Sequence, residues 1–224
     1  MKFDEFKKNE KTEAEDAKAM NLEVYEEDEI DMLEEYICKQ YGEFENVFHE
    51  IFSPDIHVDI AIVPPNENQD YYTLITMGMG AHKMNVPEEL SEYNLDRAEL
   101  VTYLPKDWKL DSDEEIWYWP LRWLKILSRL PIEQDTWLGF GHTVPSGEPV
   151  AEDVSYNCFM LIDDASTVVG TDKTINFYTM LPLYEEEMHY KIDNGAEALL
   201  SLFEQKEIPY PPVIDKQRKN VCSK

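Results

Sequence analysis

The stretch TLITMGMGAHKMNVPEE, residues 73–89, leads from an apolar run into an unusual turn. The run ends at Gly78 and Gly80, which one methionine separates, and Pro87 interrupts the chain soon afterwards. A G-x-G pair alone lacks the third glycine of the dinucleotide motif and the G-K-[ST] ending of a P-loop. Glycine adopts positive φ without steric cost, so the pattern favours a shaped turn over a phosphate-binding loop.

Two runs beside this turn have the composition of β-strands. HVDIAIV, residues 57–63, alternates in polarity, and YYTLITM, residues 71–77, is rich in aromatic and β-branched residues. Turn residues join the two runs, so we expect antiparallel neighbours. RAELVTYL, residues 97–104, supplies a third strand. Further strands are expected at 139–144, 157–162 and 174–183.

A first helix is expected over residues 30–41, because Ile30, Leu33, Ile37 and Tyr41 recur at helical spacing and Gly42 follows as a C-terminal cap. The pattern predicts that this helix docks on the core through its apolar face.

A second helical region follows residue 111. Ser112 and Glu115 have the spacing of a capping box, and Pro120 predicts a break near Trp119. Beyond the break we expect a helix that ends at Pro131. Its buried residues are expected to be Leu121, Leu124, Ile126, Leu127 and Leu130.

A last helix should start near Glu185, with an interruption at Asn194–Gly195 and apolar residues from Leu199 to Phe203. Strands and helices are mixed without regular βαβ alternation, which predicts an α+β fold: a mainly antiparallel or mixed β-sheet flanked by helices. Residues 1–29 are expected to be an acidic segment, either mobile or a solvent-exposed helix. Residues 30–224 are expected to form a single domain.

The charge of the chain limits its partners. Its 224 residues are 43% hydrophobic, and 20 Lys+Arg face 47 Asp+Glu, a net charge of −27. Such a surplus repels nucleic-acid phosphate and anionic lipid and favours a basic protein partner. Three separated cysteines and the absence of a signal-peptide or membrane-spanning pattern favour a soluble cytoplasmic protein with reduced thiols.

No motif in the chain indicates catalysis. The five histidines are scattered without a recognised metal-ligand spacing, and Glu186 with His189 lacks the second copy that a di-iron site needs. Asp111, Asp113 and Glu115 lack the later ligands of a calcium loop. No serine lies in a nucleophile elbow. We therefore expect no enzyme activity, no metal and no cofactor.

One polar set remains within the predicted strands: Asp59, Thr76 and Glu99. A buried carboxylate needs partners, and the candidates are Arg97, Lys83 or backbone N–H groups near Gly78. We favour a structural hydrogen-bond network over a ligand pocket. Among the tryptophans, Trp123 is predicted to be core, whereas Trp117 and Trp119, beside the expected helix break, are interface candidates.

The order of several segments resembles the suppressor of fused family. These segments are HVDIAIVPP, YYTLITMGMGAHKMNVP, RAELVTYLPKDW, WPLRWLKILSRLP, FMLI, LPLYEEEMHYKIDNGAEALL and DKQRKNV, spread over about residues 30–221. The resemblance implies a fold like the N-terminal domain of that family. It also implies that the opening stretch is a family turn and loop.

Animal members carry a further C-terminal domain and hold a peptide of zinc-finger transcription factors by β-augmentation. We expect this chain to be too short for that domain, so the role does not transfer. Some bacterial single-domain relatives lie in toxin loci and look like immunity proteins. The resemblance nominates these positions as a binding surface or its support: Asp59, Thr76, Gly78, Met79, Met84, Glu99, Trp108, Trp119, Tyr184 and Glu187.

The first functional hypothesis is therefore a non-enzymatic, cytoplasmic protein-binding module, an immunity or adaptor protein for a basic partner such as a toxin. The alternative is a small-molecule-binding or hydrolytic domain that uses Asp59, Glu99 and His57 or His82 in a deep pocket at the Gly78 turn. A third hypothesis is mimicry of nucleic acid by rows of carboxylates.

Overall fold

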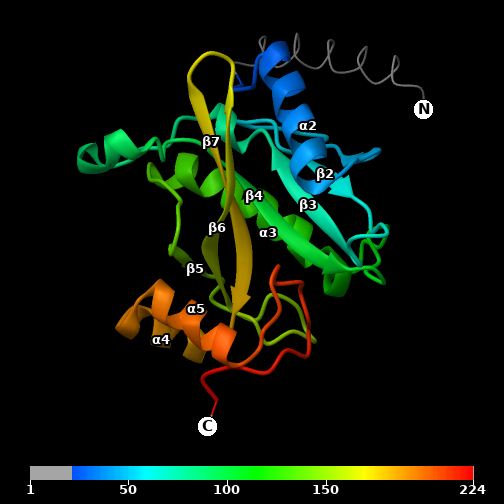
Figure 1. The fold of residues 1–224 in the computed structure, drawn as a ribbon, viewed down its shortest axis with the longest axis vertical. Helices are drawn as coiled ribbons and strands as arrows, with labels where there is room; N and C mark the ends of the chain where they lie inside the picture. The colour runs from blue at the N-terminus through cyan, green and yellow to red at the C-terminus, as the bar shows by residue number, and fades with distance from the viewer. Residues whose placement is uncertain (1–21, 224) are drawn as a thin grey trace.

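The strands assemble into one seven-stranded sheet in a computed structural model that describes residues 22–223 (Figure 1). Their order is β1-β2-β3-β4-β7-β6-β5, and every neighbouring pair is antiparallel except the parallel pair β4–β7. The bounds are β1 Asn46–Phe48, β2 Asp59–Val63, β3 Tyr71–Met77, β4 Ala98–Pro105, β5 Thr143–Pro145, β6 Cys158–Val169 and β7 Lys173–Leu183. This mixed sheet with helices confirms the predicted α+β class.

The strands with the strongest alternation or β-branched content were predicted within about two residues, and β2 and β3 are antiparallel as expected. The run expected at 139–144 begins as a turn, in which His142 N–H donates to the Gly139 carbonyl, and strand β5 starts only at Thr143. β6 extends beyond the predicted residue 162 to Val169, since it continues as a hairpin arm with β7. β1 was not predicted.

Helix α2, Glu27–Tyr41, buries Leu33, Ile37 and Tyr41 as the spacing predicts, but it begins before residue 30. Glu26 and Glu29 form its capping box. Tyr25 and Glu29 are buried, so the expected boundary at residues 29–30 falls inside an element that packs on the sheet. The rest of the expected acidic segment, residues 1–21, lies outside the described residues.

Helix α3, Glu115–Gln134, contradicts the predicted break at Trp119 and end at Pro131, because it continues through both prolines. Proline removes the N–H that would bond to the carbonyl four residues earlier. At Pro120 that carbonyl belongs to Ile116, and it accepts a hydrogen bond of 2.6 Å from Lys216 Nζ instead. The predicted capping box is also wrong: Glu114 is the N-cap residue and makes no side-chain capping bond.

The predicted interruption at Asn194–Gly195 is confirmed, since α4 spans Glu185–Asn194 and α5 spans Ala196–Gln205. Gly195 has φ of 94°, which favours glycine at this corner. Two 3₁₀ helices, η1 Met79–Ala81 and η2 Glu88–Tyr93, lie in the loop between β3 and β4.

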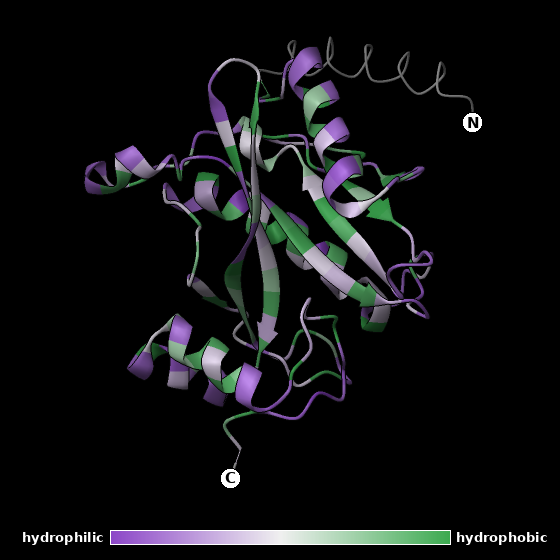
Figure 2. Cartoon of the chain, viewed as in Figure 1, coloured by the Kyte–Doolittle hydropathy of each residue, from purple (hydrophilic) through white to green (hydrophobic). Residues whose placement is uncertain are grey.

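Helices cover both faces of the sheet. α3 packs on one face with β3 and β4, whereas α2 covers the other face near one end and α5 covers the far ends of β6 and β7 (Figure 1). Hydrophilic residues mark the outer sides of α2 and α4 and the η2 loop, while the strands are largely hydrophobic (Figure 2). Within residues 22–223, none of the helices combines the length and the apolar character required to span a bilayer.

Candidate binding surface and its buried supports

Glu99 on β4 closes the turn that follows β3. Its Oε1 accepts hydrogen bonds from Tyr25 Oη at 2.8 Å, from Gly78 N–H at 2.9 Å and from Gly80 N–H at 3.0 Å. Its Oε2 accepts from Thr76 Oγ1 at 2.6 Å. The Glu99 side chain is 0% exposed, so these four protein donors replace water around the carboxylate.

Burial raises the pKa of Glu99, and the bonds from Thr76, Gly80, Gly78 and Tyr25 oppose that rise. The hypothesis of a structural network is supported, since the backbone N–H groups near Gly78 are the partners. A deep pocket at this carboxylate is contradicted, because protein atoms surround the group and already occupy its acceptor positions.

The two predicted basic partners lie elsewhere. Arg97 Nη1 donates to the carbonyls of Gly80 at 2.7 Å and Ala81 at 2.6 Å, so it braces the same turn from the outside. Lys83 forms an exposed ion pair with Asp96 at 3.3 Å.

Two positions in this turn require glycine. Gly78 has φ of 133°, and a Cβ atom there would lie 1.8 Å from the His57 carbonyl oxygen. A Cβ atom at Gly80 would lie 2.2 Å from Tyr25 Oη, the group that bonds Glu99. Met79 between them is 1% exposed and packs in the core, so it anchors the turn to the core.

Asp59 does not join Glu99. It lies at the start of β2 opposite Met77, and its carboxylate accepts from Glu50 N–H at 2.8 Å. His49 Nδ1 lies 2.8 Å and His57 Nε2 lies 3.0 Å from its oxygens. Burial acts to raise the pKa of Asp59, but the hydrogen bond and charge of His57, the bond from Glu50 N–H and the charge of His49 together hold that pKa below its ordinary value.

The alternative hydrolytic site therefore does not assemble: Asp59 and Glu99 have separate partners. His82, its other candidate base, lies with Nδ1 3.1 Å from the Glu23 carboxylate. Among residues 22–223 there is also no group of three or more His, Cys, Asp or Glu side chains arranged to hold a metal ion.

A second charged cluster beside Asp59 was missed by the sequence analysis. Glu50 Oε2 accepts from Arg129 Nη2 at 2.6 Å and from Ser53 Oγ at 2.7 Å, and Arg129 Nε donates to Asp55 at 3.1 Å. The Glu50 and Arg129 side chains are only 8% and 12% exposed. Burial acts to raise the pKa of Glu50, but the bond from Arg129 helps to lower it overall.

The irregular segment that carries Glu50 has no periodicity, which explains the omission. A signal was present in Arg129, one of three cations in the largely apolar segment WPLRWLKILSRLP. A partly buried arginine on a core helix requires a carboxylate nearby.

Glu187 anchors the end of the chain. Its two oxygens receive Arg218 Nη1 at 2.6 Å and Nη2 at 2.7 Å, and it also accepts from Val221 N–H at 2.9 Å. Its side chain is 0% exposed. The nominated Tyr184 caps α4 and donates from Oη to the Arg218 carbonyl. The motif DKQRKNV thus supplies the arginine that satisfies a buried glutamate of α4, a pairing that the sequence analysis did not make.

The nominated tryptophans and Met84 lie inside. Trp108 is 6% exposed and donates from Nε1 to the Trp117 carbonyl at 2.8 Å. Trp119 is 0% exposed, so it is a core residue and not the interface residue that the predicted break suggested. Met84 is 3% exposed, and its sulfur accepts from Leu138 N–H at 3.4 Å.

Burial is the common property of the ten nominated positions. All are buried except Asp59 and Tyr184, which are partly buried. The structure brings together Thr76, Gly78 and Glu99 in one network and Tyr184 with Glu187 in another. These residues hold strands, turns and the chain end in place, so a binding surface would lie outside them and would rest on them.

Comparison with known proteins agrees with this architecture. The pattern of the Suppressor of fused protein (SUFU) family matches residues 54–219. An uncharacterised protein of Ureaplasma parvum serovar 3, UU111, is 24% identical over 188 residues, which is 80% of this chain and 90% of that protein.

Three solved structures share the fold. A SUFU homologue from Neisseria gonorrhoeae FA 1090 has a TM-score of 0.59 and 17% identity over 85% of this chain and 94% of its own. The Sufu-Fu complex structure has a TM-score of 0.64 and 13% identity, and the match covers 85% of this chain and 91% of that chain. Suppressor of Fused from Drosophila has a TM-score of 0.55 and 14% identity, and the match covers 73% of this chain and 42% of that chain. Given the match over most of its length, the chain belongs to the suppressor of fused protein (SUFU) family.

Proposed function

We propose that this chain is a non-enzymatic protein-binding module whose partner is a basic protein. The observation that carries the proposal is the net charge of −27. Residues 1–21 hold six acidic and five basic side chains, so nearly all of the surplus belongs to residues 22–224. A field of this sign attracts a basic partner and speeds its association.

Four of the cations in the folded structure form internal contacts with carboxylates or carbonyl groups. Arg129 and Lys125 pair with Glu50, Arg218 pairs with Glu187, and Arg97 donates to turn carbonyls. These cations serve internal contacts, which leaves the acidic surplus to dominate the solvent-facing surface.

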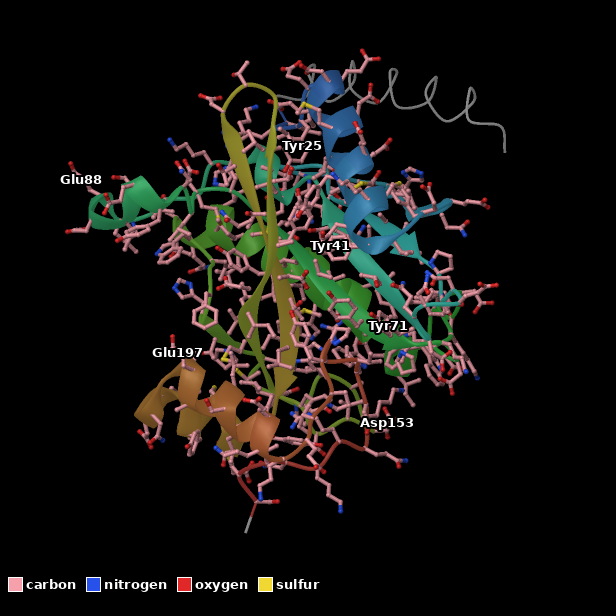
Figure 3. The ribbon with its side chains drawn as sticks, in the orientation of Figure 1. Tyr25, Tyr41, Tyr71, Glu88, Asp153 and Glu197 are labelled. Carbon is pink, nitrogen blue, oxygen red and sulfur yellow. The ribbon has the colours of Figure 1, made fainter. Side chains whose placement is uncertain are left out.

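Exposed acids occur on elements that lie far apart. Glu88 and Glu89 are exposed on the η2 loop, which projects from the body, and Glu185 and Glu186 are exposed on α4 (Figure 3). Steering by the whole surface suits this distribution. A single row of carboxylates that imitates a nucleic-acid backbone does not, so mimicry is the less supported hypothesis.

Two further points support protein binding over catalysis. The carboxylates nominated for hydrolysis are occupied by structural partners, Glu99 by four donors and Asp59 by two histidines and a backbone N–H. A protein of the same fold has been solved in the Sufu-Fu complex. Within this class, the finer proposal is an immunity role in the cytoplasm, in which the module neutralises a basic toxin.

The test begins with the tagged full-length chain, used to capture proteins from the cells that encode it. The captured protein is then purified, and its affinity and rate constants are measured at increasing salt. We expect a basic partner whose association slows steeply with salt while dissociation changes little. An acidic partner, or binding that strengthens with salt, would contradict the proposal.

The immunity role has its own measurement. The purified partner is expressed in host cells with and without this chain, and growth is followed. Growth arrest that the chain reverses supports immunity. A harmless partner would refute the immunity role while leaving the proposal of a basic binding partner intact.

A further inference from the structure

An open groove lies between α5 and the segment that follows it. Its volume is about 450 Å³. Its lining comes from three elements: Ile162 and Leu181 of the sheet, here called the floor, Leu200 and Phe203 of α5, and Ile208 and Tyr210 of the following segment, here called the wall. None of the ten nominated positions lines it.

The groove is a consequence of the sheet topology. The parallel pairing of β4 with β7 covers Ala98–Val101, and beyond it the chain segment after α5 reaches β4, where Ile214 N–H donates to the Tyr103 carbonyl at 2.8 Å. At its other end this segment is fixed by Ile208 N–H, which donates to the Phe203 carbonyl at 3.0 Å. The wall is therefore held at both ends, and the groove exists before any ligand enters. A preformed site costs less ordering on binding.

Large apolar side chains at the groove remain in contact with solvent. Tyr210 is 71% exposed and Phe140 is 38% exposed. Exposed aromatic residues beside a groove are the usual anchors of protein recognition.

Two carboxylates belong to the same lining, Asp163 of β6 and Glu204 of α5. Neither forms an ion pair with any residue in the range 22–223. The site therefore combines an apolar floor with unneutralised negative charge.

We infer that this groove binds a segment of the partner in which a large aliphatic or aromatic side chain adjoins lysine or arginine. The apolar side chain fills the space over Ile162 and Leu181, and the cation reaches Asp163 or Glu204. This inference rests on the proposed function, since it assigns the place where a basic partner is gripped. A second copy of this chain is a poor occupant, because it carries the same charge of −27.

The test uses three short synthetic peptides and the full chain: one alternates lysine and leucine, one alternates lysine and serine, and one alternates glutamate and leucine. Binding is followed through the NMR methyl signals of Ile162, Leu181 and Leu200. Two variants with the same charge change separate the groove from the general field. Glu204→Lys alters the lining, whereas Glu197→Lys alters an exposed residue of the same helix that does not line the groove (Figure 3).

We expect the lysine–leucine peptide to shift the groove methyl signals, and the lysine–serine peptide to bind more weakly without shifting them. Glu204→Lys should weaken the lysine–leucine peptide about fivefold more than Glu197→Lys does, in line with one lost ion pair. Equal weakening by the two variants, or silent groove methyl signals, would overturn the inference. Equal binding of the glutamate–leucine peptide would overturn its charge requirement.

The outcomes also separate the two proposals. If both lysine peptides bind equally and the groove stays silent, the groove inference fails while the basic-partner proposal stands. If the captured natural partner is acidic, the proposed function fails whatever the peptides do.

Discussion

The backbone conformation of Gly78 allows the turn after β3 to place its N–H groups within hydrogen-bonding distance of Glu99. The residue has φ of 133°, and any side chain would begin 1.8 Å from the His57 carbonyl oxygen. Gly147 also has positive φ, 79°, but nothing lies within 4 Å of a Cβ atom placed there. Substitution of Gly147 therefore introduces backbone strain alone, whereas substitution of Gly78 introduces both strain and a steric collision.

We predict that Gly78→Ala lowers the free energy of unfolding by about 3 kcal/mol or more, because strain and overlap add. Gly147→Ala should cost about 1 kcal/mol, from strain alone. Urea denaturation of both variants measures the difference. Equal losses would show that the turn shifts to accept a side chain, and that the close approach to His57 is not needed for the fold.

The ion pair of Glu50 with Arg129 gives stability a pH dependence. The pKa of Glu50 is lower in the folded state than its ordinary value of about 4.3. Its contribution is therefore fully present above that ordinary value and is lost as the pH falls through the lower folded value.

We predict that Glu50→Gln lowers the free energy of unfolding by about 3 kcal/mol near neutral pH, because a partly buried charge loses its partner. The difference from the unsubstituted chain should shrink as the pH drops below about 4. Denaturation across this pH range is the measurement, and Glu45→Gln, at an exposed acid of the same region, is the control. A difference that stays constant with pH would rule out a charged Glu50 as the cause.

At the scale of elements, the end of the chain is held by one arginine. Arg218 makes two hydrogen bonds to the fully buried Glu187 of α4 and lies 4.9 Å from the Phe203 ring of α5. Its removal leaves a buried carboxylate with only backbone donors from Val221 and Tyr184.

We therefore predict that Arg218→Ala lowers the free energy of unfolding by about 3–5 kcal/mol. Hydrogen exchange should accelerate most in α4, α5 and residues 215–221. Lys219→Ala, at an exposed neighbour, should leave both measurements nearly unchanged. The double variant Glu187→Leu/Arg218→Met should regain part of the loss, because no unpaired charge remains. Failure of that rescue would show that Arg218 acts through ring packing and not through Glu187.

The same scale explains which elements were predictable. β3, β4 and the face of α2 follow from local periodicity, since their own apolar residues determine their burial. The break expected in α3 was wrong because the group that satisfies the Ile116 carbonyl, Lys216, lies 100 residues further along the chain. A local rule about proline cannot include such a distant donor.

The contacts of the candidate site also fall into those that the sequence could predict and those that it could not. The network of Thr76, Gly78 and Glu99 was predictable, because polar residues within adjacent buried strands must satisfy one another. Asp59 satisfies the same rule, but its partners come from the irregular segment after β1. The pairing of Glu50 with Arg129 joins that segment to α3, and a single sequence gives no register between them.

For the whole molecule, the charge of −27 acts against folding as well as for recognition. Like charges are brought closer together in the compact state, and salt reduces their repulsion. Salt also weakens favourable ion pairs, but those of Glu50 and Glu187 are partly or fully buried and are screened less than exposed charges. Added salt should therefore weaken the repulsion between surface carboxylates more than it weakens these ion pairs.

We predict that the thermal midpoint rises by several degrees as sodium chloride increases from about 10 mM to about 0.5 M, over which the screening length falls from about 30 Å to below 10 Å. For a domain of this size each 1 kcal/mol corresponds to about 2–4 °C. Replacement of the exposed Glu88, Glu89 and Glu92 by glutamine should raise the midpoint at low salt and flatten its salt dependence. A midpoint that falls with salt in this range would mean that attractive pairs outweigh repulsion, and the acidic surface would then carry no cost for the partner to relieve.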